Sequence, residues 1–575
     1  MDLHRGRSTS VLPGDGTVLR GPPLDPRIVA LTGETLVELL VRAVDRSPDR
    51  DAIVLRRGSV DERWTYRELG ERSRRVAATL ARHGIAAGDR VVTWGPNDPW
   101  LVAALFALWR LGAIVVPLDL RMPDVVAERI GARAEPVAIL AAEAQAAGPA
   151  QVLGVPVIRL TAEELDPADA LDPDSGGAPE PAPLPPAVTP DMPAEIVFTS
   201  GTTSDPKGVQ LSHAQVIHNA RMIAQTGMGS GPDRGLGIIP LSHMYGQIVP
   251  LFMGLISGST LVFLHTLSAS AITSALREEH ITAITAVPQL ARLLLDGIDA
   301  EAARRGATSR LERARRLARF LPMDLRRTLF RSVHAALGGH LELISSGGAY
   351  LPPEVQAAWE SMGVRMVQGY GGTECAAIAG HTRASRRPGT AGRVLPGLEV
   401  QLAADSELLV RGPSVMTGYW RAPEATAEVL TPDGWLHTGD AVRVDEQGEL
   451  VILGRTRDRI ALPNGLKVYP DDVELALRET GVIRDAVVLE APPGRLAAVL
   501  LPVDPHATDQ ALAAALKQAN ATLGIHQRVS QWRRWPDADL PRTHTLKVRR
   551  DPVRAWYQER LAGERIAGFD PAKDD

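Results

Sequence analysis

Apolar residues in the first part of the chain follow two different spacings. At 35–46 and 65–83 they recur about every 3.6 positions, which predicts amphipathic helices, and 99–111 predicts a more strongly apolar helix. Short apolar runs predict buried strands at 90–93, 113–117, 137–140 and 155–160. This alternation of helices and strands predicts an α/β body with parallel-type sheets.

The pattern changes in two places farther along the chain. Residues 166–193 are rich in Pro, Asp, Ala and Gly and show no periodicity, which indicates a surface connection. After Gly454 the elements become short, with helices expected at 470–479 and 509–523 and strands at 485–489 and 497–502. We therefore expect an α/β protein with a large, multi-layered N-terminal domain at 1–455 and a small α+β C-terminal domain at 456–575.

The composition is typical of a compact globular protein and limits the classes of partner that it can attract. Of 575 residues, 45% are hydrophobic, and 63 basic residues stand against 68 acidic ones. The resulting formal charge of -5 gives no overall attraction to nucleic acid. The single cysteine, Cys375, excludes an internal disulfide and a cysteine metal cluster, and we interpret it as structural rather than nucleophilic.

Three segments bear on cellular location. The first residues lack the apolar core of a secretory signal, so we expect a cytoplasmic protein. Apolar stretches at 100–118 and 248–264 are interrupted by Gly, Pro or Arg, and we expect buried elements there rather than membrane spans.

Residues 296–340 form a strongly helical, arginine-rich segment. From Arg304 to Arg331 there are ten arginines but only two acidic residues, Glu312 and Asp324. One helical face carries Leu311, Ala314, Ala318 and Leu321. Two interpretations remain open, a solvated helix or a basic amphipathic surface that contacts anionic lipid or a phosphorylated cofactor.

A loop rich in hydroxyl groups follows the short apolar strand expected at 196–198. It contains Thr199, Ser200, Gly201, Thr202, Thr203 and Lys207. A polyphosphate needs short donors, a backbone that it can approach closely and a mobile positive charge, and these residue types supply all three. The loop is not a Walker sequence, because Pro206 precedes the lysine and Gly208 follows it, so a kinase or motor ATPase is disfavoured.

This loop resembles the signature of the adenylate-forming superfamily, which includes acyl-CoA synthetases, peptide-synthetase adenylation domains and luciferases. The resemblance continues in chain order through PLSHMYG at 240–246, SSGGAYL at 345–351, QGYGGTECA at 368–376, GWLHTGDA at 434–441, GRTRDRI at 454–460 and LPRTHTLKVRR at 540–550. These motifs span nearly all of the chain beyond its N-terminal region, and their joint order is very specific. The resemblance implies an enzyme that joins a carboxylic acid to AMP and then transfers the acyl group to a thiol.

The resemblance also implies a site for ATP and Mg²⁺. The residues implied to hold the phosphates are Thr199, Ser200, Gly201, Thr202, Thr203, Lys207 and Thr373. Those implied to hold the nucleoside, with Tyr370 stacked on adenine and the ribose on Asp440 and Arg455, are Gly347, Gly348, Ala349, Gln368, Gly369, Tyr370, Gly371, Gly372, Asp440 and Arg455. Glu374 is implied as the Mg²⁺ ligand, which is chemically suitable because Mg²⁺ prefers oxygen ligands and bridges protein to phosphate.

Catalysis is implied to depend on the tail motif. Lys547 matches the lysine that bridges the carboxylate and the α-phosphate, and its compact ammonium suits that role. Leu546 stands where the family commonly has glycine, and Lys467 is a competing cation. His243 resembles a residue near the carboxylate and the thiol passage, although a hydrogen-bonded structural histidine is nearly as good an interpretation.

The small domain of this family rotates between the two half-reactions, so the resemblance implies a mobile C-terminal domain. Arg457 matches the hinge position, and Asn464 with Gly465 resembles the loop that approaches pantetheine in the thioester-forming state. Ala461 occupies a position that is often polar.

The sequence identifies the acid and the acceptor thiol less specifically than it identifies the adenylation chemistry. The chain has no carrier domain after Lys547, so we expect free CoA or a separate acyl carrier protein as acceptor. The helical segment before SSGGAYL, the GYGGTE motif and NGLKVYP resemble long-chain acyl-CoA synthetases, which favours a medium- or long-chain fatty acid. An aryl or specialised acid, and a non-catalytic nucleotide-binding relative, are the alternatives.

Overall fold

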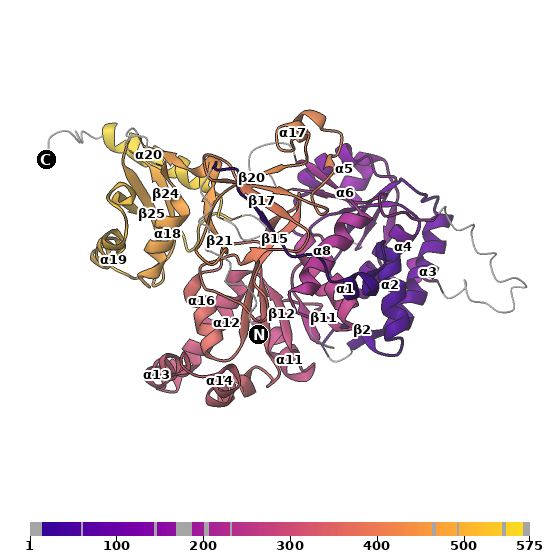
Figure 1. Ribbon diagram of the computed structural model, residues 1–575, viewed down its shortest axis with the longest axis horizontal. Helices are drawn as coiled ribbons and strands as arrows, with labels where there is room; N and C mark the ends of the chain where they lie inside the picture. Colours follow the sequence, from indigo (N-terminus) through magenta and orange to yellow (C-terminus); the bar gives the residue numbers. More distant parts are fainter. Residues whose placement is uncertain are drawn as a thin grey trace, which may run out of the picture.

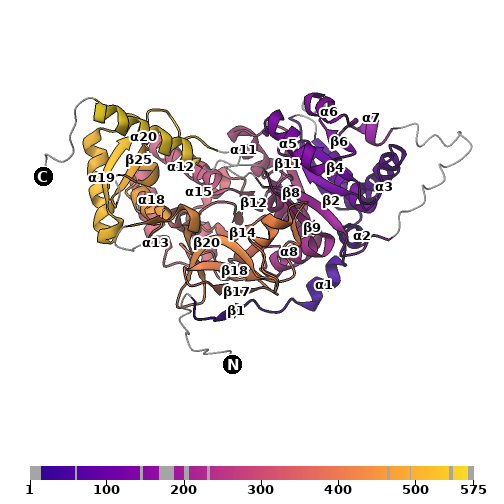
Figure 2. The ribbon, with the colours of Figure 1, turned by 90° about the horizontal axis from the view of Figure 1, so that it is seen from above.

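The computed structural model describes residues 14–58, 61–142, 147–167, 187–199, 206–229, 233–462, 467–491, 494–542 and 548–566. These form a large α/β domain built on three sheets and a smaller C-terminal domain built on two (Figure 1). Figure 1 and Figure 2 show the small domain, coloured orange to yellow, at one end of the molecule. Helices α2 (Leu36–Arg46), α3 (Tyr66–Arg82) and α4 (Pro99–Arg110) lie at the other end.

A seven-stranded sheet, of order β19-β9-β8-β5-β4-β6-β7, carries the expected phosphate loop. Its strands are β4 (Arg90–Trp94), β5 (Ile114–Pro117), β6 (Ala138–Ala141), β7 (Val157–Arg159), β8 (Pro193–Phe198), β9 (Gly208–Ser212) and β19 (Gly418–Tyr419). Strands β8, β5, β4, β6 and β7 pair in parallel, whereas β8 and β9 form an antiparallel hairpin.

Helices cover both faces of this sheet because its strands are apolar on both sides. One face packs on α2 (Leu36–Arg46), α3 (Tyr66–Arg82) and the almost wholly buried α4 (Pro99–Arg110). The other face packs on α5 (Asp124–Ala134) and α6 (Ala147–Leu153). Helix α3 begins with a capping box in which the Thr65 hydroxyl accepts from the backbone of Glu68, and the Glu68 carboxylate accepts from the backbone of Thr65.

A nine-stranded sheet has the order β16-β15-β14-β13-β12-β10-β11-β2-β3. Its strands are β2 (Asp51–Arg56), β3 (Asp61–Thr65), β10 (Arg234–Gly237), β11 (Thr260–Leu264), β12 (Ala283–Ala286), β13 (Leu343–Ser346), β14 (Arg365–Gly372), β15 (Ala376–Gly380) and β16 (Arg393–Val394). The strands from β2 to β14 in this order are parallel, and the pairs at the two edges are antiparallel.

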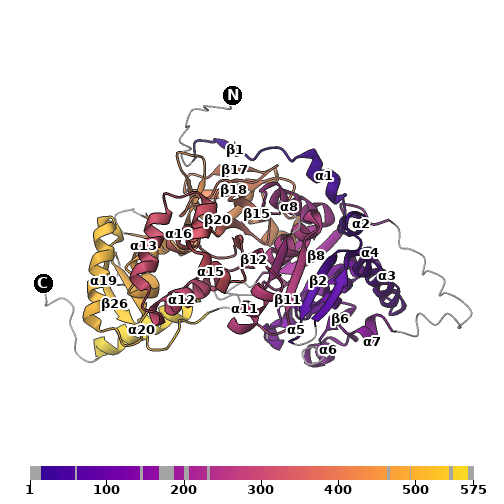
Figure 3. The same cartoon turned by 90° about the horizontal axis from the view of Figure 1, so that it is seen from below.

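The arginine-rich segment belongs to the helical layer on one face of this sheet. That layer contains α11 (Ala269–Glu278), α12 (Pro288–Arg304), α13 (Thr308–Ala318), α14 (Met323–Leu329), α15 (Arg331–Ala336) and α16 (Pro353–Ser361). Figure 3 shows α12, α13, α15 and α16 on the side of the large domain that borders the small one. The opposite face of the sheet packs on α8 (His213–Gln225) and α10 (Met253–Ser257).

The third sheet of the large domain is antiparallel, with the order β1-β17-β18-β20-β21. Its strands are β1 (Val18–Arg20), β17 (Glu399–Leu402), β18 (Glu407–Arg411), β20 (Leu436–Val444) and β21 (Leu450–Arg455). Short helices complete the large domain, namely α1 (Pro26–Thr32), α7 (Ala162–Leu165), α9 (Met244–Gly246), the π-helix η2 (Gln247–Phe252), α17 (Pro423–Ala427) and the 3₁₀ turn η3 (Thr456–Asp458).

The small domain is an α+β unit with its own core. It contains β22 (Ile460–Ala461), β23 (Lys467–Val468), α18 (Pro470–Glu479), β24 (Ile483–Glu490), β25 (Leu496–Pro502), α19 (Asp509–Thr522), η4 (Ile525–Gln527), β26 (Val529–Arg534) and α20 (Arg550–Ile566). Helices α18 and α19 cover one face of the sheet formed by β24, β25 and β26, and α20 covers the other.

Polar contacts join the two domains. The Arg478 guanidinium lies 6.0 Å from the centre of the Tyr350 ring. An Arg459 nitrogen lies 3.6 Å from an Asp405 carboxylate oxygen. Contacts of this kind between partly exposed groups contribute little stability, so they hold the small domain weakly.

The structure confirms the expected α/β class and the order of elements, with two differences. The pairing of β2 with β3 and the whole third sheet are antiparallel, and short hairpins join β2 to β3, β17 to β18 and β20 to β21, where a parallel pair needs a crossover. The arginine-rich segment is divided among four helices, with breaks at Gly306, Pro322 and Phe330. The stretches at 100–118 and 248–264 are buried elements, and none of the helices in the described residues is both long and apolar enough to span a bilayer.

Candidate active site

The expected phosphate loop is the tip of the hairpin between β8 and β9. Its two ends are tied together, because the backbone N–H of Thr199 donates to the carbonyl of Lys207 at 3.0 Å. Ser200, Gly201, Thr202 and Thr203 lie outside the described residues. The Lys207 ammonium lies 5.1 Å from the centre of the Tyr419 ring and 3.8 Å from the Glu428 carboxylate, so its position is fixed at the base of the loop.

Tyr419 links the phosphate loop to Glu374, the expected Mg²⁺ ligand. Strand β19 pairs with β9 beside the loop, and the Tyr419 hydroxyl donates to Oε1 of Glu374 at 3.0 Å. Burial and the Glu374 charge raise the pKa of Tyr419, so the phenol keeps the proton that it donates. The backbone of Glu374 is also held, since its carbonyl accepts from the N–H of Met416 at 2.7 Å.

A tight turn between β14 and β15 presents Thr373 and Glu374 at the surface. Gly371 lies so close to β15 that an added Cβ would be 1.7 Å from the carbonyl oxygen of Ala376, which requires glycine there. Cys375 beneath the turn is buried, and burial raises the pKa of its thiol to about 12, so it remains a neutral packing group as expected.

The residues expected at the nucleoside form a connected group. The Tyr370 hydroxyl donates to Oδ2 of Asp440 at 2.7 Å, and Nε of Arg455 lies 3.1 Å from Oδ1 of the same carboxylate. Asp440 and Arg455 are paired across β20 and β21, so the sheet sets their spacing. Burial and the Asp440 charge hold the pKa of Tyr370 well above its usual value.

Gly347, Gly348 and Ala349 follow the end of β13. A Cβ at Gly347 would lie 3.2 Å from the Tyr245 ring, so the small residue lets this aromatic ring pack against the strand end. The Tyr245 hydroxyl lies 3.0 Å from the Ser345 hydroxyl, and these two groups share a hydrogen bond. Gln368 lies within β14 with its side chain buried, one residue before Gly369.

His243 belongs to a hydrogen-bonded group that sequence reasoning did not find. Its Nε2 lies 3.0 Å from Oδ2 of the buried Asp119, and Arg121 donates to both oxygens of that carboxylate at 3.0 and 2.9 Å. Burial alone would raise the pKa of Asp119, but the hydrogen bonds from His243 and Arg121 hold it well below its usual value. Asp119 lies two residues after the end of β5, and the carboxyl ends of parallel strands are the usual place for ligand-binding residues, which was the available signal.

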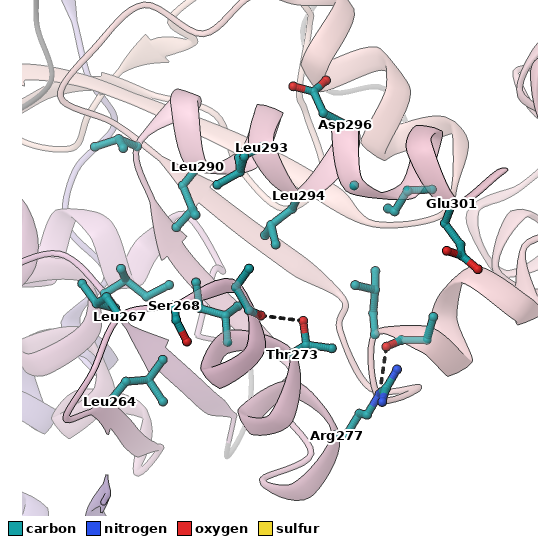
Figure 4. Close-up of a pocket in the computed structure, with 18 of the residues that line it drawn as sticks. Leu264, Leu267, Ser268, Thr273, Arg277, Leu290, Leu293, Leu294, Asp296 and Glu301 are labelled. Atoms are coloured by element: carbon teal, nitrogen blue, oxygen red, sulfur yellow. Dashed lines mark hydrogen bonds between the residues drawn. The ribbon is translucent and has the colours of Figure 1, made fainter. Parts of the chain in front are cut away.

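A cavity of about 1460 Å³ extends from His243 and Asp119 under the helical layer of the nine-stranded sheet. Figure 4 shows Leu290 and Leu294 of α12 pointing into it opposite Leu264 of β11. Its lining is mainly apolar, and further members include Ile238, Ile272, Ile298, Leu311, Val333 and Leu337. Tyr370 and Asp440 do not line it, so the cavity is separate from the group that Tyr370, Asp440 and Arg455 form.

The expected catalytic residues of the small domain lie largely outside the described part of the chain, namely Lys547, Leu546, Asn464 and Gly465. The ends of the Lys547 loop are described, and Arg542 and Val548 form an antiparallel bridge that closes it. Arg550, just beyond, is held by Asp471 and Glu474 of α18. Arg457 lies in η3 between the domains with an exposed side chain, 3.9 Å from the Asp458 carboxylate.

Comparison with known proteins finds both a family and individual relatives. The sequence profile described as "AMP-binding enzyme" matches residues 40–420. A feruloyl-CoA synthase of an Amycolatopsis species is 29% identical over 458 residues, which are 76% of this chain and 84% of that protein. An indoleacetate–CoA ligase of Aromatoleum aromaticum is 30% identical over 522 residues, covering 85% of this chain and 92% of its own length. A long-chain-fatty-acid–CoA ligase of Mycobacterium bovis is 30% identical over 512 residues, covering 83% of each chain.

Solved structures share the fold. The o-succinylbenzoate coenzyme A synthetase of Bacillus subtilis, in complex with AMP, superposes with a TM-score of 0.72 at 23% identity. The superposition covers 89% of this chain and 97% of the other.

Proposed function

Because the chain belongs to the AMP-binding enzyme family, we propose that it is an ATP-dependent acid–CoA ligase whose substrate is a medium- or long-chain fatty acid. In the first half-reaction a carboxylate oxygen attacks the α-phosphorus of ATP, and pyrophosphate leaves. In the second, the CoA sulfur attacks the acyl carbon of the acyl-adenylate, AMP leaves, and the thiol proton is lost.

The cavity carries the proposal for the acid. At about 1460 Å³ it exceeds the usual range of ligand pockets, about 300–1,000 Å³, and its lining is mainly apolar. A flexible alkyl chain buries its full length against such a lining, whereas a compact aromatic acid leaves most of it unfilled. His243 and Asp119 lie where the carboxyl end of that chain would meet the nucleotide.

Different residues of the proposed nucleotide site bind different parts of ATP. Lys207 and the hydroxyl loop neutralise the β- and γ-phosphates, Asp440 and Arg455 hold the ribose, and Tyr370 stacks on adenine. Glu374 would hold Mg²⁺, and a single carboxylate fits that ion because it is usually bound through one or two carboxylates together with substrate phosphates. Mg²⁺ at this position would supply neutralisation of the phosphate charge.

We assign the principal role in adenylation to Lys547. Attack of one anion on another requires a positive charge placed between the carboxylate and the α-phosphate, and an ammonium can supply it. Arg542 and Val548, which flank Lys547 in the sequence, form an antiparallel bridge, and the ion pairs of Arg550 anchor the start of α20 to α18. Rotation about Arg457 would then withdraw Lys547 and bring Gly465 towards the thiol path.

His243 is proposed to act in the second half-reaction, with Asp119 as its positioning residue. An ionised carboxylate only accepts hydrogen bonds, so Nε2 of His243 donates to Asp119, and this contact sets the orientation of the ring. Arg121 holds Asp119 from the other side, which fixes the carboxylate and therefore the ring.

A panel of acids tests the proposal. Purified protein is given ATP, Mg²⁺, CoA and one of hexanoate, octanoate, dodecanoate, hexadecanoate, ferulate or indoleacetate, and acyl-CoA is detected by mass. We expect the highest kcat/KM among the fatty acids. A preference for ferulate or indoleacetate would assign the enzyme to aryl acids, and replacing CoA by a phosphopantetheinylated carrier protein identifies the acceptor.

A further inference from the structure

Helices α13 and α14 have two different faces. Their inner face lines the acyl cavity through Leu311, Ala314, Leu329 and Phe330. The predicted apolar face of α13 therefore packs against the core of the large domain, where Ala318 is fully buried. The outer surface is a separate feature, which we call the α13–α14 face. Its exposed basic and apolar residues are Arg313, Arg316, Leu317, Arg319, Phe320 and Leu325, and its exposed acidic residues are Glu312 and Asp324.

The α13–α14 face exposes more apolar area than a solvated helix requires. Phe320 is 86% exposed, Leu317 59% and Leu325 53%. Arg313 and Leu317 are four positions apart in α13, so a basic and an apolar group share one side of that helix, and Phe320 lies in the turn that follows it. The two helices form the lower edge of the molecule in Figure 1 and are not covered by another described element there.

The arginines of this segment differ in what holds them. Arg304 and Arg305 pair with Glu301, Arg315 pairs with Asp299 at 2.8 Å, and Arg326 and Arg327 donate to backbone carbonyls. Within the described residues, no carboxylate lies at ion-pair distance from Arg313, Arg316 or Arg319, the three arginines of the α13–α14 face. These three outnumber the exposed Glu312 and Asp324 and leave the face with a net positive charge.

We propose that the α13–α14 face docks peripherally on an anionic lipid bilayer. Exposed Phe and Leu side chains beside arginines match such a surface, since the apolar groups enter the headgroup boundary while the guanidinium groups contact lipid phosphates. The acyl cavity lies directly behind the same two helices, so docking places its wall next to the phase in which long-chain acids are dissolved. Only this last step, delivery of the acid, rests on the proposed function.

Vesicle sedimentation of the full chain tests the proposal. Vesicles contain phosphatidylcholine alone or with a large fraction of phosphatidylglycerol, and we expect retention on the anionic vesicles that decreases with salt. The variant Arg316→Glu with Arg319→Glu should weaken binding at least about 25-fold, since each arginine near an anionic surface contributes about fivefold. The matched control is Lys517→Glu with Arg528→Glu, which makes the same charge change on exposed residues of the small domain. It should change binding less than about twofold.

A second set of matched variants tests how much the apolar side chains contribute to vesicle binding. Leu317→Ser with Phe320→Ser should weaken binding about tenfold, whereas Ile525→Ser, at a residue 83% exposed on the small domain, should not. Octanoyl-CoA synthesis without vesicles should be unchanged in all of these variants, because none of the substituted residues lines the cavity. Vesicle binding without any ligase activity would reject the proposed function and leave the docking surface standing.

Three results would overturn the proposal: no wild-type binding to anionic vesicles, equal binding to neutral vesicles, or full binding by both α13–α14 variants. If the charge variant raised the KM for CoA several-fold and left vesicle binding intact, the arginines would instead recognise the phosphates of CoA.

Discussion

Asp119 and His243 lie 3.0 Å apart, between Oδ2 and Nε2, although 124 positions separate them in the sequence. The contact brings the end of β5 to the loop before α9, at one end of the acyl cavity. It gives His243 a fixed ring orientation that an isolated histidine would not have.

Asp119→Asn should therefore affect the second half-reaction more than the first. The amide keeps the size of the carboxylate but no longer favours a donating Nε2, so we expect thioester formation to fall about 10–100-fold. Acid-dependent exchange of pyrophosphate into ATP should remain within about threefold, because adenylation does not use this ring. Arg121→Gln is the control. It removes the other hydrogen-bonding partner of Asp119, while the charged Asp119 carboxylate still faces His243. Equal losses in both half-reactions would show that Asp119 only stabilises the fold.

Tyr419→Phe should weaken the use of Mg²⁺ by raising its half-saturating concentration about 5–10-fold. The substitution removes one hydrogen bond to the Glu374 carboxylate and keeps the ring beside Lys207. Glu374→Gln should have a larger effect of the same kind, because it removes the charge that attracts the ion. Titration of initial rates with Mg²⁺ at saturating ATP measures both, and an unchanged Mg²⁺ dependence in Glu374→Gln would remove this residue from the metal site.

Gly297→Leu should restrict the enzyme to shorter acids. Gly297 lines the cavity from α12, and an added Cβ there meets no atom within 4 Å, so a leucine side chain would occupy cavity space. We expect kcat/KM for hexadecanoate to fall at least about tenfold while that for octanoate stays within about twofold. Gly297→Ala is the control, because it makes the same gain in helix propensity without filling the cavity. Equal losses for both acids would place the acyl chain elsewhere.

Glu195→Gln should change how stability depends on pH. Glu195 is fully buried on β8, and burial raises the pKa of its carboxyl from 4.5 to about 8. The folded state therefore holds a proton that the unfolded state has lost, so stability falls as pH rises from the unfolded pKa to about 8.

Between about pH 6 and about pH 8, wild type should lose about 3 kcal/mol of unfolding free energy more than Glu195→Gln does. Urea denaturation at several pH values measures this difference, with the exposed Glu312→Gln as control. Parallel pH profiles for wild type and Glu195→Gln would show that the carboxyl is not held neutral.

Local signals in the sequence predict most of the elements, and contacts between distant segments explain what they miss. The Thr65 and Glu68 pair marks the start of α3, and the apolar spacing of 470–479 matches α18 residue for residue. Tyr419 and Asp119 carry no motif of their own, because their roles depend on neighbours more than forty positions away. Arg315 resembles the surrounding arginines in sequence, yet its pairing with Asp299 makes it structural.

The central claim is tested most directly by mass detection of acyl-AMP in reactions that contain ATP, Mg²⁺ and a fatty acid but no CoA. We expect a bound dodecanoyl-adenylate with wild type, and about two to three orders of magnitude slower formation with Lys547→Ala but not with Lys517→Ala. Absence of any adenylate from wild type, across the full acid panel, would contradict the account.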